Sequence, residues 1–365
     1  MSLFLMAGGG TGGHVIPAIA VARELVKQGH EVVFVGTERG AEGRLVPAAG
    51  FRLETIEAGG LKRLGLATKA ASLYHLGAET LRLRSLFAQW KPAAVFSMGG
   101  FVAGPTVLAA LSRSIPVVLM EPNAIPGITN RAIASQVKRA LVSFEETAAY
   151  FPKGRTEITG LPVREEFFAI PPKPDSAEFT ILITGGSQGS QTLNNAARAA
   201  WSLFVDSGLP VRIIHQTGTA MFETVAREFA ATGLPGEVSA FIADMPTAFR
   251  EADLVVCRSG AGAVSELAAA GKPSVLIPFP FAADDHQLRN AQAFERAGAS
   301  MLSLDREWTG QRFFEFVREL YADPGRVEAM GQKARSLART GAASRAAEIL
   351  MQLAVDKHSS NRNNK

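Results

Sequence analysis

The sequence predicts an α/β protein built from two parallel-sheet domains, and three observations carry this prediction. The chain has 365 residues, and at roughly 100–200 residues per domain that length suggests two domains. Short apolar runs rich in β-branched residues alternate with amphipathic helical patterns, as in doubly wound α/β folds. A unit of strand, glycine-rich loop, helix and strand at 3–36 recurs at 179–216.

The expected strands are mostly continuous apolar runs, because helices cover both faces of a parallel sheet. They are Leu3–Ala7, Glu31–Gly36, Ala94–Ser97, Val117–Met120, Phe179–Thr184, Val211–Gln216, Asp253–Cys257 and Ser274–Pro278. The first helix is expected from His14 to Gln28, where apolar residues form a 3.6-residue stripe and Gly29 is a stop signal.

A proline-rich connector, Ile170–Pro174, separates the two repeated units, so we expect a domain boundary near residues 160–175. The polar tail 357–365 is expected to be disordered. A single cysteine, Cys257, excludes an internal disulfide and fits a reducing compartment. Residues 1–22 carry no charged side chain and lack the positive start of a signal peptide.

Two further segments bear on membranes. Residues 92–112 are uncharged but are interrupted by glycines and prolines, so we interpret them as strand, turn and helix rather than as a membrane span. Residues 61–91 hold six basic side chains against Glu79 alone, which favours an anionic partner. The six are Lys62, Arg63, Lys69, Arg82, Arg84 and Lys91.

The first glycine loop, Gly8–Gly13, follows a strand and opens a helix, where backbone N–H groups and the helix N-terminus attract an anion. The loop matches G-x-G-x-x-G, and Glu38 ends the next strand, so an NAD-dependent oxidoreductase is one hypothesis. Two features weigh against it: His14 directly follows the last glycine, and a second glycine loop opens the other half.

That second loop is Gly185–Ser190, in which Ser187 and the backbone amides could hold a phosphate. A third cluster, Ser97–Phe101, ends another strand. Each loop alone could be a tight turn. Three such loops at the carboxyl ends of strands are better explained by a ligand crevice.

Cys257–Glu266 also leads from a strand into a helix. Glu266 lies about one and a half turns into that helix, where its carboxylate could accept hydrogen bonds from ribose hydroxyls. The alternative is a carboxylate that only complements the helix dipole. The chain has no D-x-D pattern, no Walker A motif and no histidines at metal-ligand spacing, so we expect neither a metal nor a cofactor.

Together these segments resemble the MurG family, the peptidoglycan N-acetylglucosaminyltransferases of the GT-B class. The resemblance runs from Gly8 to about Leu350. It rests on Gly9–His14, Met98–Phe101, Asn123, Thr129–Asn130, Gly160–Arg164, Gly185–Gly189, Cys257–Glu266 and His286–Ala291. It implies two Rossmann-like domains, 1–162 and 163–341, that face each other across a cleft, with a last helix, 342–356, that returns to the first domain.

The resemblance also implies the substrates. UDP-N-acetylglucosamine would be the donor and undecaprenyl-pyrophosphoryl-N-acetylmuramyl-pentapeptide, or lipid I, the acceptor, giving lipid II and UDP. Ser187 and Arg164 would lie near the diphosphate, Ile242 at the uracil through its backbone and Glu266 at the ribose, while Asn123 and Gln287 would reach the N-acetylglucosamine. The remaining implied substrate-binding residues are Thr11, Gly12, Gly13, Ala261, Gly262, Ala263, Val264 and Ser265.

An enzyme of this type should invert the anomeric configuration, and a base must take the acceptor's C4 hydroxyl proton. His14 is the first candidate, because a helix N-terminus favours the neutral imidazole, although His14 could instead only bond the backbone. Glu121 is the second. The chain departs from the family at Met120–Asn123, where His-Glu-Gln-Asn is usual, so no role for that histidine is transferred.

Three other hypotheses remain open: a UDP-N-acetylglucosamine 2-epimerase-like isomerase on the same fold, the oxidoreductase, and a non-catalytic nucleotide-sugar binding protein. An epimerase acts on a free nucleotide sugar and needs no membrane. The basic, leucine-rich 61–91 segment therefore favours the transferase, docked peripherally on the anionic cytoplasmic face of the plasma membrane.

Overall fold

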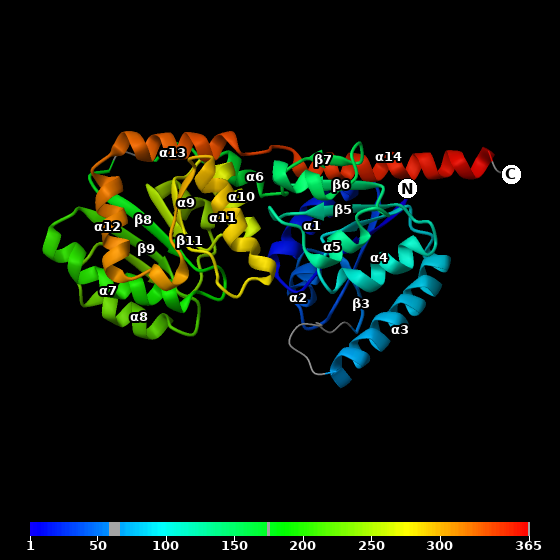
Figure 1. Cartoon of the computed structure of the whole chain (residues 1–365), viewed down its shortest axis with the longest axis horizontal. Coiled ribbons are helices and arrows are strands. Elements are labelled where there is room, and N and C mark those ends of the chain that lie inside the picture. The colour runs from blue at the N-terminus through cyan, green and yellow to red at the C-terminus, as the bar shows by residue number, and fades with distance from the viewer. Residues whose placement is uncertain (58–65, 174–175, 364–365) are drawn as a thin grey trace. The chain divides into compact units, whose positions relative to one another are not determined.

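A computed structural model describes residues 1–57, 66–173 and 176–363, without the side chains of 66–73 and 357–363. The chain forms two compact units (Figure 1). Unit 1 is Met1–Val163 together with Gly341–Lys365, and unit 2 is Arg164–Thr340. Each unit is built around one parallel sheet.

Unit 1 holds a seven-stranded sheet in the order β3-β2-β1-β4-β5-β6-β7. The strands are β1 Leu3–Ala7, β2 Glu31–Gly36, β3 Arg52–Thr55, β4 Ala94–Ser97, β5 Val117–Glu121, β6 Arg139–Val142 and β7 Thr156–Ile158. The helices are α1 Gly12–Lys27, α2 Ala41–Ala48, α3 Leu66–Trp90, α4 Ala103–Leu111, α5 Ile128–Ile133, the 3₁₀ helix η1 Glu145–Tyr150 and α14 Ala342–Asn363. Leu5 on β1 pairs in register with Val33 on β2 and with Val95 on β4, and all three are buried.

Unit 2 holds a six-stranded sheet in the order β10-β9-β8-β11-β12-β13. The strands are β8 Phe179–Thr184, β9 Val211–Gln216, β10 Gly236–Ser239, β11 Leu254–Cys257, β12 Ser274–Leu276 and β13 Ser300–Leu302. The helices are α6 Glu165–Phe168, α7 Gln191–Ser207, α8 Phe222–Ala230, α9 Met245–Glu251, α10 Ala261–Ala270, η2 Ala283–Asp285, α11 His286–Arg296, η3 Asp305–Glu307, α12 Gly310–Tyr321 and α13 Pro324–Ser336.

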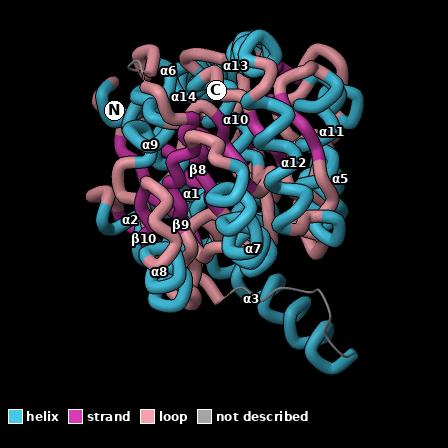
Figure 2. Tube along the Cα trace, turned by 90° about the vertical axis from the view of Figure 1, so that its left-hand side faces the viewer, coloured by secondary structure: helices cyan, strands magenta, loops and turns pink. Residues whose placement is uncertain are grey.

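The strand order creates a topological switch point in each sheet. β1 lies between β2 and β4, and β8 lies between β9 and β11, so successive connections leave β1 and β8 in opposite directions. Helices therefore cover both faces of the strands, as Figure 2 shows with strands in magenta and helices in cyan. In open α/β sheets ligands bind at such points, outside the carboxyl ends of the strands.

The predicted class, two parallel-sheet α/β domains, is confirmed. Helix α1 begins at Gly12, two residues before the predicted start, because Thr11 adopts the extended N-cap conformation. Helix α14 continues to Asn363 and so passes through most of the segment that was expected to be disordered; Asn364 and Lys365 lie outside the described residues. Of the helices described, none is both long and apolar enough to span a membrane.

Candidate functional site

In unit 1 the first glycine loop lies at the β1/β4 switch point. Thr11 is the N-cap of α1 and makes no side-chain capping bond, while Gly12 and Gly13 form the first helical turn. The first N–H groups of a helix have no acceptor within the helix, so the N–H groups of this turn form an anion-attracting helix start. Thr11 and Gly13 are exposed and Gly12 is half-buried.

His14 is half-buried, and its Nδ1 lies 3.2 Å from the carbonyl oxygen of Gly9. Gly100, at the end of β4, has a positive φ of 77°, and a methyl group added to it would lie 3.4 Å from Cε1 of the ring. Loops from two adjacent strands therefore flank the imidazole. If Nδ1 carries the proton and donates it to Gly9, Nε2 holds the lone pair that a base requires.

Glu121 is 1% exposed, and both of its carboxylate oxygens accept two hydrogen bonds. Oε1 accepts from the backbone N–H of Asn123 at 3.0 Å and from Asn123 Nδ2 at 3.1 Å, and Oε2 accepts from the backbone N–H of Gly127 at 3.1 Å and from Asn130 Nδ2 at 2.7 Å. Burial raises the pKa of Glu121, although these bonds oppose the shift. Its carboxylate therefore orders the loop that carries Asn123.

Asn130 connects this cluster to the loop after β4. Its side chain is 3% exposed, and a methyl group on Gly99 would lie 2.2 Å from Asn130 Oδ1. Gly99 and Gly100 therefore contact Asn130 and His14, respectively, so the three glycine and asparagine segments of unit 1 meet at one edge of the sheet. Asn130 belonged to the sequence motif but had no predicted role.

Unit 2 repeats the arrangement after β8. Ser187 is exposed at the tip of the Gly185–Ser190 loop. Ser190 is the N-cap of α7, and its Oγ accepts from the backbone N–H of Leu193. Gly189 has a φ of 74°, and a methyl group there would lie 1.8 Å from the carbonyl oxygen of Thr217. Only glycine therefore lets the loop lie against the strand next to it.

Gln216, which the sequence did not indicate, supports both this loop and Ile242. The side chain is 2% exposed, and its Nε2 donates to the carbonyl of Gly186 at 2.9 Å. Its Oε1 accepts from the backbone N–H of Ile242 at 2.8 Å. Because that N–H is already used, the Ile242 carbonyl is the backbone group left to meet a base edge.

The third segment of unit 2 is the start of α10. Gly260 is its N-cap and makes no side-chain capping bond, so the N–H groups of Ala261, Gly262 and Ala263 form the helix start. The Val264 side chain is fully buried and its N–H donates to the Gly260 carbonyl at 3.1 Å, which leaves it little to offer a ligand. Ser265 is half-buried.

Glu266 follows within α10 and is half-buried. Burial raises the pKa of its carboxyl to about 7, and the positive charge of Arg164 opposes that shift. Arg164 itself is exposed at the N-cap of α6, with its guanidinium 4.9 Å from the centre of the Phe167 ring. The Arg164 guanidinium and the Glu266 carboxylate therefore interact electrostatically.

Gln287 lies in the first turn of α11, and its Oε1 accepts from the backbone N–H of Phe279 at 3.0 Å. Its carbonyl accepts from Ser259 Oγ at 2.8 Å, and Asn290 Nδ2 donates to the Ser259 carbonyl at 3.1 Å. Fully buried Ser259 and Asn290 therefore hold Gln287 beside the loop that leads into α10.

Arg258 and Asp305 were missed as site residues. Arg258 Nη2 donates to Ser190 Oγ at 2.7 Å, and Nη1 donates to the carbonyls of Ile277 and Pro278 at 3.1 and 3.2 Å. Nη1 also forms an ion pair with Asp305. One guanidinium thus joins the loops that follow β8, β11 and β12.

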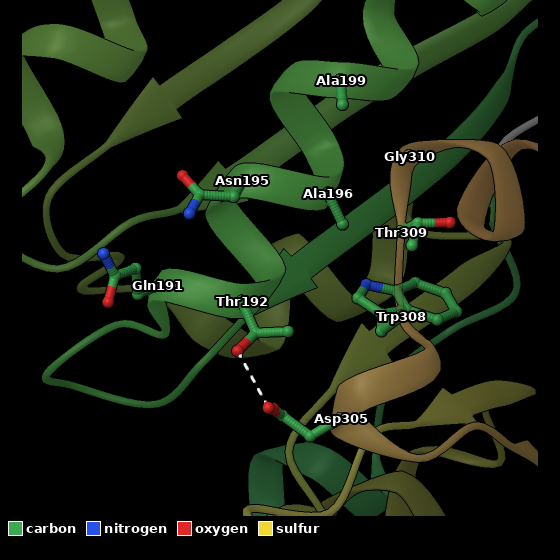
Figure 3. Close-up of a pocket in the computed structure, with 9 residues that line it drawn as sticks. All are labelled: Gln191, Thr192, Asn195, Ala196, Ala199, Asp305, Trp308, Thr309 and Gly310. Atoms are coloured by element: carbon green, nitrogen blue, oxygen red, sulfur yellow. Dashed lines mark hydrogen bonds between the residues drawn. The ribbon is translucent and has the colours of Figure 1, made fainter.

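Asp305 also lines a surface pocket of about 470 Å³ (Figure 3). The first turns of α7, η3 and the start of α12 line it, and Thr192 Oγ1 donates to Asp305 at 3.2 Å across it. None of the residues predicted to bind substrate is among its described lining. We therefore assign this pocket no part in the candidate site beyond Asp305.

The chain matches both domains of a known family. Residues 4–142 match the N-terminal domain of glycosyltransferase family 28, and residues 180–350 match its C-terminal domain. Over 351 residues, 96% of each chain, the sequence is 63% identical to the UDP-N-acetylglucosamine–N-acetylmuramyl-(pentapeptide) pyrophosphoryl-undecaprenol N-acetylglucosamine transferase of Solibacter usitatus. The chain belongs to the MurG family.

Solved structures agree with this assignment. The crystal structure of MurG from Acinetobacter baumannii superposes with a TM-score of 0.80 at 32% identity, covering 96% of this chain and 100% of that one. The UDP-GlcNAc 2-epimerase from Neisseria meningitidis reaches a TM-score of 0.68 at 15% identity, covering 96% and 100%. At that identity the likeness to the epimerase concerns the fold alone.

Proposed function

We propose that this MurG-family chain transfers N-acetylglucosamine from UDP-N-acetylglucosamine to the C4 hydroxyl of the N-acetylmuramyl sugar of lipid I, with inversion, releasing UDP and lipid II. The 63% identity to a transferase of that name, over 96% of both chains, carries the proposal. The glycine loops and helix starts at both switch points support it, because each suits an anionic, phosphate-bearing ligand.

Unit 2 is proposed to bind the donor. The N–H groups of Ala261–Ala263 and Ser187 would meet the diphosphate with Arg164, while Glu266 would accept from the ribose hydroxyls and the Ile242 carbonyl would meet uracil. Gln287, with Asn123 of unit 1, would reach the N-acetylglucosamine. Helix-start N–H groups and a guanidinium stabilise the negative charge that develops on departing UDP.

Unit 1 is proposed to bind the acceptor, with Thr11–Gly13 near its pyrophosphate and His14 as the base. The C4 oxygen attacks the anomeric carbon, the bond from that carbon to the β-phosphate oxygen breaks, and the hydroxyl proton passes to His14 Nε2. Glu121 is less suited to this step, because four donors already occupy its oxygens. We propose a positioning role for Glu121.

The deciding assay measures UDP release from UDP-N-acetylglucosamine with and without a soluble lipid I analogue. The proposal expects release that depends on the acceptor, and a disaccharide product whose new linkage is β, since the donor linkage is α. Acceptor-independent formation of the 2-epimer would indicate the isomerase instead. Bound nicotinamide absorbance would indicate the oxidoreductase.

We further propose that the enzyme docks on an anionic membrane surface, at the cytoplasmic face of the plasma membrane, through residues 61–91. The acceptor's reactive sugar lies at the headgroup layer, so a protein that reaches it must approach that layer. The basic side chains of the segment and exposed Leu81 support this proposal, because cations and apolar side chains together bind anionic interfaces.

A further inference from the structure

Glu42 is a buried carboxylate directly behind the first glycine loop. It lies in the first turn of α2 and is 0% exposed. Its Oε2 accepts from the backbone N–H of Gly10 at 2.7 Å, and its Oε1 accepts from the backbone N–H of Thr37 at 2.8 Å and from Thr37 Oγ1 at 2.6 Å. Burial favours the neutral form, but these hydrogen bonds outweigh it and lower the pKa of Glu42, so the group is ionised at neutral pH.

The surrounding glycines leave just enough room for this carboxylate. A methyl group on Gly9 would lie 2.3 Å from Oε1, one on Gly40 would lie 2.2 Å from Oε2, and one on Gly36 would lie 2.7 Å from Cγ. Any side chain at these three positions would displace the glutamate. The glycines at these positions therefore leave the space that the Glu42 side chain fills.

One peptide unit joins Glu42 to His14. The N–H of Gly10 donates to Glu42 Oε2, and the carbonyl of Gly9, in the same peptide plane, lies 3.2 Å from His14 Nδ1. Hydrogen bonds in a chain polarise one another, so a carboxylate at the N–H end makes the carbonyl oxygen a stronger acceptor. A stronger acceptor at Nδ1 keeps the proton there and makes Nε2 more basic.

We propose that Glu42 is a positioning residue that fixes the tautomer and orientation of His14 through the Gly9–Gly10 peptide. The arrangement serves the purpose of the aspartate in a Ser-His-Asp triad, which holds its histidine in one tautomer by a direct bond. Here a backbone peptide stands between the two side chains. The inference rests on the proposed function only in its kinetic part, because the tautomer can be observed without turnover.

The test uses ¹⁵N NMR of the full-length protein labelled at histidine, with the His14→Gln spectrum assigning the His14 signals. Wild type is expected to show neutral His14 protonated on Nδ1. Glu42→Gln is expected to shift His14 toward a mixture of tautomers and to lower kcat by about 10–100-fold, the range known for the loss of a group that orients a metal-ligating histidine, with the donor KM unchanged.

Thr37→Val is the matched control. It removes the hydroxyl that donates to Oε1 and accepts from the Gly40 N–H, but it keeps the Gly10 bond to Oε2, so the wild-type tautomer is expected even if the melting temperature falls. Should Glu42→Gln not fold, Glu42→Asp replaces it, because the shorter carboxylate lengthens the same bond.

Protonation of wild-type His14 on Nε2 would overturn the proposal, as would a glutamate variant with the wild-type tautomer and kcat. If His14→Gln loses kcat but Glu42→Gln keeps the wild-type tautomer and kcat, the role of Glu42 is refuted and the proposed function of the chain stands. Unchanged kcat in His14→Gln beside a shifted tautomer in Glu42→Gln would refute only the catalytic role of His14.

Discussion

At the scale of single residues, the two candidate bases differ in what their side chains already contact. Glu121 is 1% exposed and accepts three hydrogen bonds from the loop after β5 and a fourth from Asn130 on α5, so removing its charge would leave these donors without their acceptor. His14 is half-buried, with Nδ1 directed at a backbone carbonyl. The geometry therefore favours His14 for proton transfer and Glu121 for order.

His14→Ala is expected to lower kcat by about 10²–10⁴-fold, the range for a lost general base, with UDP affinity nearly unchanged. Steady-state kinetics with a soluble acceptor analogue and calorimetric titration of UDP measure the two quantities. His75→Ala is the control, because that histidine is exposed on α3. A near-normal kcat in His14→Ala would make Glu121 the leading candidate.

Glu266 predicts a pH dependence of donor binding. In the proposed role, the ionised carboxylate of Glu266 accepts hydrogen bonds from the ribose hydroxyls. Burial raises the pKa of Glu266 from the ordinary 4.5 to about 7. Affinity for UDP-N-acetylglucosamine should therefore fall as pH drops through 7, by at most about tenfold per unit. The free energy of unfolding has the opposite pH dependence. Because the pKa of Glu266 is raised in the folded state, its contribution to stability is present at acidic pH and is lost as pH rises through 7.

Calorimetric titrations of wild type and Glu266→Gln across this pH range measure the effect. UDP-N-acetylglucosamine is the probe, because its doubly substituted diphosphate does not titrate near neutrality. We expect a flat pH profile in Glu266→Gln, and Glu266→Ala should weaken binding by about 1–3 kcal/mol. Wild-type affinity in Glu266→Ala would remove this residue from the site.

Some site residues could not be predicted from the sequence, and the reason is distance along the chain. Glu42 is 32 residues from Gly10, and Asp305 is 47 residues from Arg258. Gln216 ends a strand that reads as ordinary core. These side chains hydrogen-bond to the glycine loops or to the residues that hold them. The sequence shows the glycines, but only the folded structure shows which polar side chain reaches each loop.

At the scale of elements, the sequence predicts most of the central strands, but it misses the interior strand β6 and the edge strands β3, β7, β10 and β13. β1, β2, β4, β8 and β9 were predicted with their observed bounds because both faces are covered and the residues are mostly apolar. β3 Arg52–Thr55 and β10 Gly236–Ser239 lie at sheet edges, where a polar four-residue segment gains pairing from its neighbour rather than from its own pattern.

Asp305 is expected to stabilise the loops that follow the central strands of unit 2. Asp305 anchors Arg258, which joins Ser190 to the carbonyls after β12. Losing a charged hydrogen-bond partner costs about 1–3 kcal/mol, so Asp305→Asn should weaken UDP binding by at most that amount, through the loops that Arg258 holds. Thr192→Val is the control, because it removes only the 3.2 Å bond across the pocket. Equal affinities of Asp305→Asn and wild type would show that Arg258 needs no anchor.

At the scale of the whole molecule, the open question is how a protein reaches a lipid-linked sugar. Helix α3 and Lys91, directly after it, form the described part of the basic segment. Its Leu83 and Phe87 are buried, whereas Leu81 is 69% exposed. Arg82 is engaged within the protein: it pairs with Glu54 and Glu79 and donates to the Thr55 carbonyl. Arg84 and Lys91 are exposed, while Lys62 and Arg63 lie outside the described residues.

These contacts sharpen the membrane prediction. We expect binding to anionic vesicles at low ionic strength, weakened by salt, since each basic residue near such a surface contributes about 1 kcal/mol within a Debye length. Joint replacement of Lys62, Arg63 and Arg84 by glutamine should reduce cosedimentation and leave UDP affinity unchanged. Arg82→Gln is the matched control. Because the Arg82 guanidinium is already paired within the protein, this variant should have a lower melting temperature but nearly unchanged vesicle binding. Equal binding to neutral and anionic vesicles, or an undiminished triple variant, would exclude this segment as the docking surface.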